Sequence, residues 1–422
     1  MKLLDDLTWR DSIAQSTDRD ALERDLNAGP ISLYLGFDPT APSLHIGNLV
    51  ALVVLRRFQL AGHRPIPLVG GATGLVGDPS GRNQERALNE VEVVAQWVER
   101  IKGQLSGFLE FDSGANKAIM ANNLDWTKDL SAIDFLRDIG KHFSVNQMLA
   151  KDSVASRLET GGISYTEFSY QVMQAYDYLE LFRREGCTLQ IGGSDQWGNI
   201  VAGVDLIRRV EGKSVHAMTI PLLTKADGSK FGKTASGSVW LDPTMTSPYS
   251  FFQFFLNSDD RDVVGLLKTF SFKSHEELSE LFAEHEKNPG SRVAHRALAS
   301  EVTGYIHGES TARKVEEAAR ALFGHSEIRE IDRETLMGAI AELPRVEVTE
   351  EAGISWVDAM ASSSVLDSKS AARRIIKEGG AYLNNTKVSD EGATLRAEDF
   401  LHGEVALLRK GKRDLVAVVK KR

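Results

Sequence analysis

Two lysines in a glycine-containing loop and a histidine ahead of an apolar segment are the side chains whose types and spacing first suggest chemistry. Lys230 and Lys233 lie in the loop 224–234, whose composition is typical of a flexible segment that could close over phosphates. His45 lies just ahead of the apolar segment 49–60, where the N–H groups and the dipole of a helix start favour phosphate. These features predict a site that positions a nucleotide for attack at its α-phosphorus.

Two neighbours strengthen this prediction. Thr40 lies in the same turn as His45, and Gly47 leaves no side chain between the backbone and a ligand. A lone His-x-Gly segment is weak evidence and is more often only a helix start. Here Asp38-Pro39-Thr40 begins seven residues ahead of the histidine, which makes the combination specific.

The glycine-rich segments have other possible interpretations. The lysine loop could be a solvated basic turn, and Gly232-Lys233-Thr234 also ends like a P-loop. A P-loop needs a glycine at position 227, where this chain has Asp227, so that motif is excluded. Residues 70–74 resemble a dinucleotide-binding fingerprint only loosely, because they lack its glycine order.

A second group of polar residues is predicted to bind a small zwitterion. Tyr170, Gln174 and Asp177 have the spacing i, i+4 and i+7 on a predicted helix 167–184, so they share one face. Asp177 could accept a hydrogen bond from a substrate hydroxyl, and Tyr34 could complete that pair. Tyr170 and Gln174 could hold an α-ammonium group together with Asp78. The alternative is a polar helix face in water.

The elements that must position these residues alternate between strands and helices. This alternation predicts an α/β fold with a parallel, doubly wound sheet, whose strands bind ligands at their carboxyl ends. The expected strands are 31–37, 65–69, 118–121, 187–191 and 215–223, and the expected helices are 49–60, 133–139, 167–184 and 196–209.

The chain changes character after about residue 248. Apolar residues at helical spacing over 251–321 predict a helical domain, and the short mixed segment 345–355 is a plausible hinge. The tail is expected to contain a helix over 370–378 and strands over 381–383, 405–408 and 415–419.

Charge is distributed unevenly along the chain. The formal net charge is −9, but residues 369–422 hold 13 Lys and Arg against 7 Asp and Glu, a local balance of +6. Residues 1–368 then hold 37 basic and 52 acidic side chains, a balance of −15. A basic tail on an acidic body is typical of a nucleic-acid-binding appendage, although a solvated basic surface would look the same by charge alone.

Composition narrows the class of protein. Cys187 is the only cysteine, which rules out an internal disulfide framework and suits a reducing compartment. The first residues lack the apolar stretch of a signal peptide, and the longest apolar run is too short to span a bilayer. We therefore expect a cytoplasmic protein without membrane contact.

Taken together, the motifs resemble the bacterial tyrosine–tRNA ligases of synthetase class I. The resemblance is dense from Leu33 to Tyr249, and the tail from about Ser355 is similar to the small S4-type RNA-binding domain. The motifs that carry it are Tyr34 and Gly36-Phe37-Asp38-Pro39-Thr40, His45-Ile46-Gly47-Asn48, Gly70-Gly71-Ala72-Thr73-Gly74, Gly77-Asp78-Pro79-Ser80-Gly81, Tyr170 with Gln174 and Asp177, the run from Ile191 to Asn199, and Lys230 to Thr234.

The resemblance implies roles that spacing cannot prove. Tyrosine would be bound by Tyr34, Asp38, Asp78, Tyr170, Gln174, Asp177 and Gln196. The phosphate chemistry would be handled by Thr40, His45, Asn48, Arg82, Arg86, Lys230 and Lys233. Gly193 and Asp195 would hold the ribose, and Gly36, Gly47 and Thr234 complete the predicted ATP site.

The resemblance also implies an organisation and partners. We expect a Rossmann-like catalytic domain over 1–247, a helical domain over 248–344, a linker over 345–354 and an S4-like RNA-binding domain over 355–422. ATP is expected as substrate with Mg²⁺, with no protein-bound metal, because the ten histidines are scattered. A homodimer that binds L-tyrosine and tRNA(Tyr) is expected.

One position departs from the family pattern. The nucleotide signature usually ends in a second histidine, and here that residue is Asn48, which can donate a hydrogen bond but cannot carry charge. The hypothesis is that Asn48 fills the same nucleotide-facing role. Two rivals remain: a tryptophan–tRNA ligase, against which Tyr34 and Asp177 argue, and an RNA-binding scaffold without catalysis, against which His45 and the lysines argue.

Overall fold

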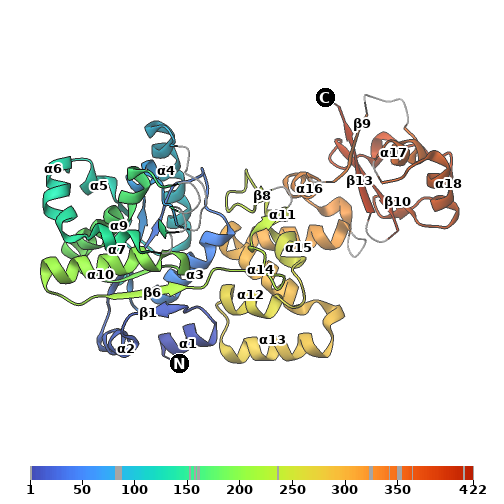
Figure 1. Ribbon diagram of the computed structural model, residues 1–422. Coiled ribbons are helices and arrows are strands. Elements are labelled where there is room, and N and C mark those ends of the chain that lie inside the picture. Colours follow the sequence, from blue (N-terminus) through green and yellow to red (C-terminus); the bar gives the residue numbers. More distant parts are fainter. Residues whose placement is uncertain are drawn as a thin grey trace. The chain divides into compact units, whose positions relative to one another are not determined.

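The structure is a computed structural model that describes residues 2–80, 88–151, 154, 155, 158, 162–234, 237–322, 327–341, 343–348, 354–363, 365–411 and 414–421. The chain divides into two compact units, both drawn in Figure 1. The first comprises Met1–Met245 with Ser258–Ala294, and the second comprises Thr246–Asn257 with His295–Arg422.

The first unit is built on a six-stranded sheet of order β1-β6-β5-β2-β3-β4, in which every neighbouring pair is parallel except β1 with β6. The chain adds β3 and β4 on one side of β2 and adds β5 and β6 on the other. The sheet is therefore doubly wound, as predicted. The strands of this unit are β1 (Gln15–Ser16), β2 (Ser32–Phe37), β3 (Arg64–Val69), β4 (Ala121–Asn122), β5 (Cys187–Gly193), β6 (His216–Ile220), β7 (Lys233–Thr234) and β8 (Gly237–Ser238).

Helices cover both faces of this sheet (Figure 1). Helix α3 packs against β2 and β3, and helix α4 packs against β3. Helices α9 and α10 pack against each other and against β5. The helices of the unit are α1 (Leu3–Trp9), α2 (Arg19–Ala28), α3 (Ile46–Leu60), α4 (Val91–Phe108), α5 (Leu124–Thr127), α6 (Ala132–Asp134), α7 (Val145–Leu149), α9 (Tyr165–Glu185), α10 (Trp197–Glu211), α12 (Val263–Phe270) and α13 (His275–Lys287).

Helix α9 shows why these residues form these elements. The hydroxyl of Ser164 accepts from the N–H of Glu167 at 3.2 Å and so caps the helix start, and Gly186 ends the helix at φ +60. Its apolar side, which includes Tyr178 and Leu179, is buried in a core shared with β2, β3 and α10. Burial of each large apolar side chain contributes about 1.5–3 kcal/mol, which fixes the polar side of α9 relative to the sheet.

The second unit contains helices followed by a mixed sheet. The sheet has the order β11-β10-β12-β13-β9, antiparallel except for the pair β13 and β9. Its elements are α11 (Pro248–Leu256), α14 (Val293–His307, which crosses the boundary of the units), α15 (Glu309–Leu322), α16 (Arg333–Ala339), β9 (Arg345–Val348), α17 (Trp356–Ser362), α18 (Lys369–Lys377), β10 (Ala381–Leu383), β11 (Thr386–Lys387), β12 (Val405–Lys410) and β13 (Asp414–Lys420).

The structure confirms the fold class and corrects details. Strand β9 lies in the segment 345–354 that was interpreted as a linker, and it pairs along β13 from Arg345 to Val348. Its four residues alternate between polar and apolar, too short a pattern to distinguish a strand from a connection. The strand expected over 118–121 is reduced to β4, and α4 and α17 were not predicted. In the parts of the chain that the structure describes, no helix is long and apolar enough to cross a membrane.

Candidate active site

Helix α3 begins at the histidine that was predicted to face phosphate. His45 is the N-cap of α3, and its Nδ1 accepts from the backbone N–H of Gly47 at 3.0 Å. A ring whose Nδ1 accepts carries its proton on Nε2, which leaves Nε2 as the donor available to a ligand. Burial, together with the nearby Lys233, lowers the pKa of His45 and so keeps the ring neutral.

Asn48 has a structural role that was not predicted from the sequence. Its Oδ1 accepts from the backbone N–H of His45 at 3.1 Å, so the side chain closes the first turn of α3. The amide oxygen is therefore engaged by the backbone. The Nδ2 group can donate in the nucleotide-facing role proposed for this residue.

The lysine loop and the start of α3 are joined through one residue. The N–H of Val239 donates to the carbonyl of Gly232 at 3.0 Å, and the carbonyl of Val239 accepts from Ile46 at 3.1 Å. A side-chain carbon on Gly232 would come within 3.4 Å of Ile46, so this close approach, at φ +89, favours glycine. The two segments that were predicted to handle phosphate thus lie side by side.

The two lysines act on different members of the predicted nucleotide site. Lys233, in β7, is close enough to His45 to lower its pKa. Burial and the nearby Asp78 raise the pKa of Asp195, whereas Lys230 lowers it. Asp195 follows the carboxyl end of β5, so each lysine lies near one predicted member of the nucleotide site.

The amino-acid end of the site centres on Asp38. The hydroxyl of Tyr170 donates to Oδ2 of Asp38 at 2.6 Å, and the hydroxyl of Thr73 donates to Oδ1 at 2.7 Å. Burial and the negative charges of Asp38 and Asp78 raise the pKa of Tyr170, so its phenol stays protonated and keeps donating. Thr73 belongs to the motif Gly70–Gly74, but the sequence predicted no role for its side chain.

Asp177 is held by two donors from the segment after β4. Trp126 Nε1 donates to Oδ1 of Asp177 at 2.8 Å, and Asn123 Nδ2 donates to Oδ2 at 3.0 Å. Asp177 is only 2 % exposed, and burial raises its pKa to about 7, although these two donors oppose the rise. Its charge state therefore changes near neutral pH.

Two polar atoms near this carboxylate are buried without a hydrogen-bond partner among the described residues. They are the hydroxyl of Tyr34, 1 % exposed, and Oε1 of Gln174. An unpaired buried polar atom costs about 1–3 kcal/mol, so such atoms are expected where a ligand supplies the missing partner. Tyr34 and Asp177 are also close enough for the carboxylate to raise the pKa of the phenol, after burial as the larger cause.

Asp78 and Gln196 connect the sheet edge to α10. Gln196 Nε2 donates to Oδ2 of Asp78 at 2.6 Å, and Oδ1 of Asp78 accepts from the N–H of Ser80 at 2.9 Å. Asn199 donates to both Gln196 and Ser80 at 3.3 Å. Both predicted residues thus belong to one network, and Asn199 and Ser80 support it.

The remaining predicted residues are placed as follows. Gly36, Gly47 and Thr40 are exposed at the end of β2 and the start of α3, and Gly193 is the last residue of β5. Thr234 belongs to β7. Arg82 and Arg86 lie outside the described residues, so their predicted roles stay predictions.

Sequence reasoning missed Asn123 and Trp126. A signal was present, because both follow a strand of a parallel sheet at its carboxyl end, where ligand-binding residues gather. The strand β4 is only two residues long, and this shortness concealed the signal.

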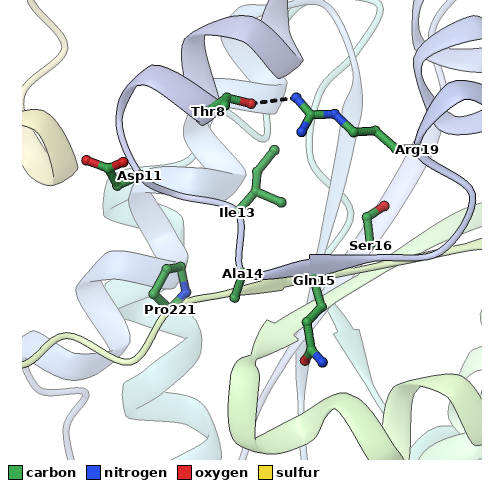
Figure 2. Close-up of a pocket in the computed structure, with 8 residues that line it drawn as sticks. All are labelled: Thr8, Asp11, Ile13, Ala14, Gln15, Ser16, Arg19 and Pro221. Carbon is green, nitrogen blue, oxygen red and sulfur yellow. Dashed lines mark hydrogen bonds between the residues drawn. The ribbon is translucent and has the colours of Figure 1, made fainter.

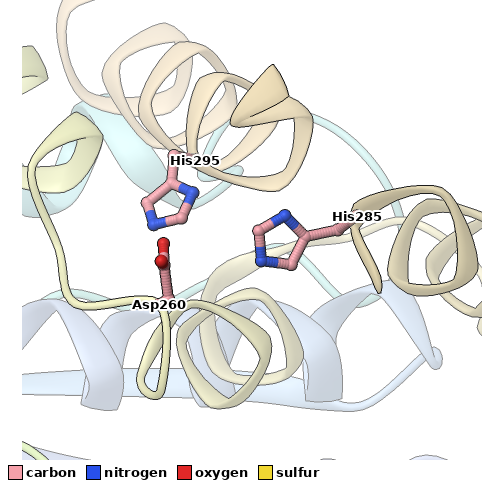
Figure 3. A group of neighbouring side chains, drawn as sticks. All are labelled: Asp260, His285 and His295. Atoms are coloured by element: carbon pink, nitrogen blue, oxygen red, sulfur yellow. The ribbon is translucent and has the colours of Figure 1, made fainter. Parts of the chain in front are cut away.

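One group of side chains has the composition of a metal site. Asp260, His285 and His295 are side chains of types that bind metal ions, and the ligand atoms of Asp260 and His285, both in the first unit, lie within 4.8 Å of each other (Figure 3). The expectation that the chain holds no metal stays a prediction.

A surface cavity of about 480 Å³ lies beside β1 and contains none of the predicted site residues (Figure 2). Arg19 donates to the hydroxyl of Thr8 at 2.7 Å on its rim. The arrangement that carries chemistry is instead the polar edge of the sheet around β2 and β5.

The fold and the site define a class I tRNA synthetase. Residues 26–324 match the model of the family tRNA synthetases class I (W and Y), and residues 335–418 match that of the tyrosine–tRNA ligase SYY-like C-terminal domain. The chain belongs to the tyrosine–tRNA ligase family.

Relatives and solved structures agree with this assignment. The tyrosine–tRNA ligases of Streptomyces avermitilis and Streptomyces coelicolor are each 57% identical over 418 residues, covering 99% of this chain and 98% of theirs. A C-terminally truncated mitochondrial tyrosyl-tRNA synthetase from Aspergillus nidulans matches with a TM-score of 0.70 and 32% identity, covering 76% of this chain and 94% of that chain.

Proposed function

We infer that this chain is a tyrosine–tRNA ligase. It activates L-tyrosine with ATP to tyrosyl-adenylate, releasing diphosphate, and then transfers the tyrosyl group to the 3′ end of tRNA(Tyr). The observation that carries the inference is the buried pair of Tyr34 and Asp177 in a chain of this family. Among the residues that the structure describes, the phenol of Tyr34 has no hydrogen-bond partner, and the carboxylate of Asp177 can accept a hydroxyl, as a tyrosine side chain requires.

Recognition of tyrosine is assigned to both ends of the polar face of α9. Asp177 accepts the substrate hydroxyl, and Tyr34 pairs with the same oxygen. At the other end, Asp38, Asp78, Tyr170, Gln174 and Gln196 surround the ammonium and carboxyl groups. A phenylalanine in this site would leave the hydroxyl of Tyr34 without a partner and would give Asp177 no hydrogen bond from the substrate, which costs binding free energy. Selectivity for tyrosine over phenylalanine follows from that cost.

Recognition of ATP is assigned to the start of α3 and the lysine loop. The N–H groups at the helix start and neutral His45 donate to phosphate oxygens, with Thr40 and Asn48 beside them. Lys230 and Lys233 carry the positive charge that the departing diphosphate needs. Asp195 with Gly193 holds the ribose. Arg82, Arg86, Gly36, Gly47 and Thr234 complete the proposed nucleotide site.

Activation is an in-line displacement. A carboxylate oxygen of tyrosine attacks the α-phosphorus of ATP, the bond to the β-phosphate breaks, and diphosphate leaves with the electron pair. No protein group becomes covalently attached, so the enzyme acts by orienting the reactants and stabilising charge. Mg²⁺ enters with ATP, since phosphate oxygens suit that cation. A terminal ribose hydroxyl of tRNA then attacks the tyrosyl carbonyl and releases AMP.

The second unit is assigned to tRNA binding. Its helix α18 carries Lys369, Arg373, Arg374 and Lys377, within the tail whose local charge is +6. Exposed acids partly offset these charges, as in the pairs Lys369–Asp358 and Lys377–Glu391. Phosphate contacts of this kind weaken as salt rises. The proposed organisation is a catalytic, a helical and an S4-like domain, and the proposed location is the cytoplasm.

A homodimer is the proposed assembly. Several large apolar side chains are exposed in the stretch between α6 and the start of α9, among them Ile133 at 72% and Tyr165 at 70%; the others include Leu136, Val145 and Leu149. Apolar side chains that gather on a surface mark sites of protein association. A second copy of the chain is the proposed occupant.

Sedimentation of the full chain and of a variant with Ile133→Asp and Leu136→Asp tests the assembly. We expect twice the 46.4 kDa chain mass for the unmodified protein and the single mass for the variant. Leu60→Asp, which changes an equally exposed leucine at the end of α3, is the control. A monomeric unmodified protein would contradict the proposal.

Exchange of labelled diphosphate into ATP tests the function itself. The assay is run with tyrosine, tryptophan or phenylalanine as the only amino acid. We expect exchange with tyrosine alone at low concentration. Exchange with tryptophan would show the rival ligase, and no exchange with any of the three, in a folded protein that binds tRNA, would show an RNA-binding scaffold.

A further inference from the structure

The lysine loop is closed by its own hydrogen bonds. The N–H of Lys225 donates to the carbonyl of Ser229 at 2.8 Å, and the N–H of Gly228 donates to the carbonyl of Lys225 at 2.8 Å. The carboxylate of Asp227 accepts from the N–H of Ser229 at 2.8 Å. Residues Thr224 and Lys230 pair as a short antiparallel bridge. The tip is therefore an ordered turn, and a contact with a residue outside the loop can fix the orientation of the whole turn.

A hydrogen bond holds this tip to another part of the first unit. The N–H of Ala226 donates to Oδ1 of Asp262 at 2.8 Å. Asp262 is not part of the loop: it lies 36 residues further along the chain, immediately before α12. A hydrogen bond between a carboxylate and a backbone N–H is among the stronger kinds in proteins.

Asp262 is well anchored at its own position. Its N–H donates to the carbonyl of Asp259 at 2.9 Å, and its carbonyl accepts from the N–H of Leu266 at 2.9 Å. The helix that follows is fixed by Val263, Leu267 and other fully buried apolar side chains. The carboxylate therefore presents a rigid acceptor to the tip of the loop.

The opposite end of the loop is also fixed. Gly232 is held through Val239 against the start of α3, as described above. Lys230 and Lys233 lie at this end of the loop, Lys230 between the two tethers. Their charges act on Asp195 and His45 respectively, so each lysine lies near a residue of the proposed nucleotide site.

We propose that Asp262 is a positioning residue for tyrosine activation: by accepting from Ala226, it holds the lysine loop with Lys230 directed at the ATP phosphates. This proposal rests on the function proposed above. Asp262 lies outside the site, and through Lys230 it would help to stabilise the charge of the leaving diphosphate. Since a hydrogen bond to a charged, partly exposed group is lost, the rate of adenylate formation should fall about 5- to 20-fold in Asp262→Ala.

Single-turnover formation of tyrosyl-adenylate at saturating tyrosine and ATP tests this. Asp262→Ala should lower the rate constant, while the dissociation constant for tyrosine should stay within about twofold of the unmodified value. Asp262→Asn, whose Oδ1 can still accept, should recover most of the rate. Asp18→Ala is the matched control, because Asp18 also accepts a backbone N–H, from Ala21 at 3.0 Å, ahead of a helix of the same unit.

A double substitution separates positioning from a general loss of structure. In a Lys230→Ala background, Asp262→Ala should cause little further loss, because the lysine through which Asp262 acts is gone. Independent, multiplying losses would overturn the proposal, as would a normal rate in Asp262→Ala. Unfolding temperatures of all variants are measured alongside. Failure of the function itself would be recognised separately, as absence of tyrosine-dependent adenylate in the unmodified protein.

Discussion

The indole N–H of Trp126 donates to Oδ1 of Asp177 at 2.8 Å, in a part of the core where Asp177 is only 2 % exposed. With Asn123 on the other oxygen, this contact orients a carboxylate that would otherwise be buried without donors. The proposed reader of the substrate hydroxyl is thus itself held in place by residues that need not touch the substrate.

Replacing Trp126 tests that arrangement. Trp126→Phe keeps an aromatic ring but removes the N–H, so the ionised form of Asp177 loses a donor. We expect tyrosine to bind roughly 5- to 30-fold more weakly at pH 7, measured as the equilibrium dissociation constant. Trp97→Phe, a change of the same type on α4, is the control. Equal behaviour of the two variants would contradict a role for Trp126 in holding Asp177.

The pH dependence of tyrosine binding follows from the pKa of Asp177. Burial raises this pKa to about 7, and the substrate phenol donates to the ionised form. Tyrosine should therefore bind more tightly as pH rises through 7, by about tenfold between pH 6 and pH 8. Asp177→Asn should abolish this dependence. Tighter binding at lower pH would contradict the proposed hydrogen bond.

The carboxyl group of Asp177 has the opposite effect on stability: its contribution to the free energy of unfolding falls as pH rises, whereas tyrosine binding becomes tighter. The folded pKa of Asp177 lies above the value of about 3.9 expected in the unfolded chain. Between these two values the folded state binds more protons, so the contribution of Asp177 to the free energy of unfolding is greatest below pH 4 and declines as pH rises to 7. The carboxylate that reads the substrate therefore costs stability at neutral pH.

Asn48 should contribute to both folding and nucleotide use. In Asn48→Ala the capping bond to the N–H of His45 is lost, which should lower the free energy of unfolding by about 1 kcal/mol. If Nδ2 also faces the nucleotide, KM for ATP should rise in the same variant. Chemical denaturation and ATP-dependent exchange measure the two effects. Unchanged ATP kinetics would leave the cap as the only role of Asn48.

Much of the site could be predicted because its residues follow local patterns, such as helical spacing and the start of a helix. Tyr170, Gln174 and Asp177 lie on one face of α9 since helical spacing places them there, and His45 begins α3 since an apolar helix follows it. These relationships depend on neighbours in the chain. They can be derived from the type and spacing of residues alone.

The rest depends on contacts between distant segments. The donors Asn123 and Trp126 reach Asp177 only because the segment after β4 lies against α9, and Asp262 reaches Ala226 only because the start of α12 lies beside the lysine loop. Strand β9 likewise needs β13 as its partner. No periodicity in the sequence encodes such pairings, so these contacts could be identified only from the three-dimensional structure.

The central claim is that Asp177 reads the hydroxyl of tyrosine, and steady-state kinetics of Asp177→Asn test it most directly. This variant keeps the shape of the side chain but loses its charge. Asn123 and Trp126 would still meet a polar group. We predict a fall of about 10- to 100-fold in kcat/KM for tyrosine, with KM for ATP within about twofold of the unmodified value. Equal losses for tyrosine and ATP would contradict the account.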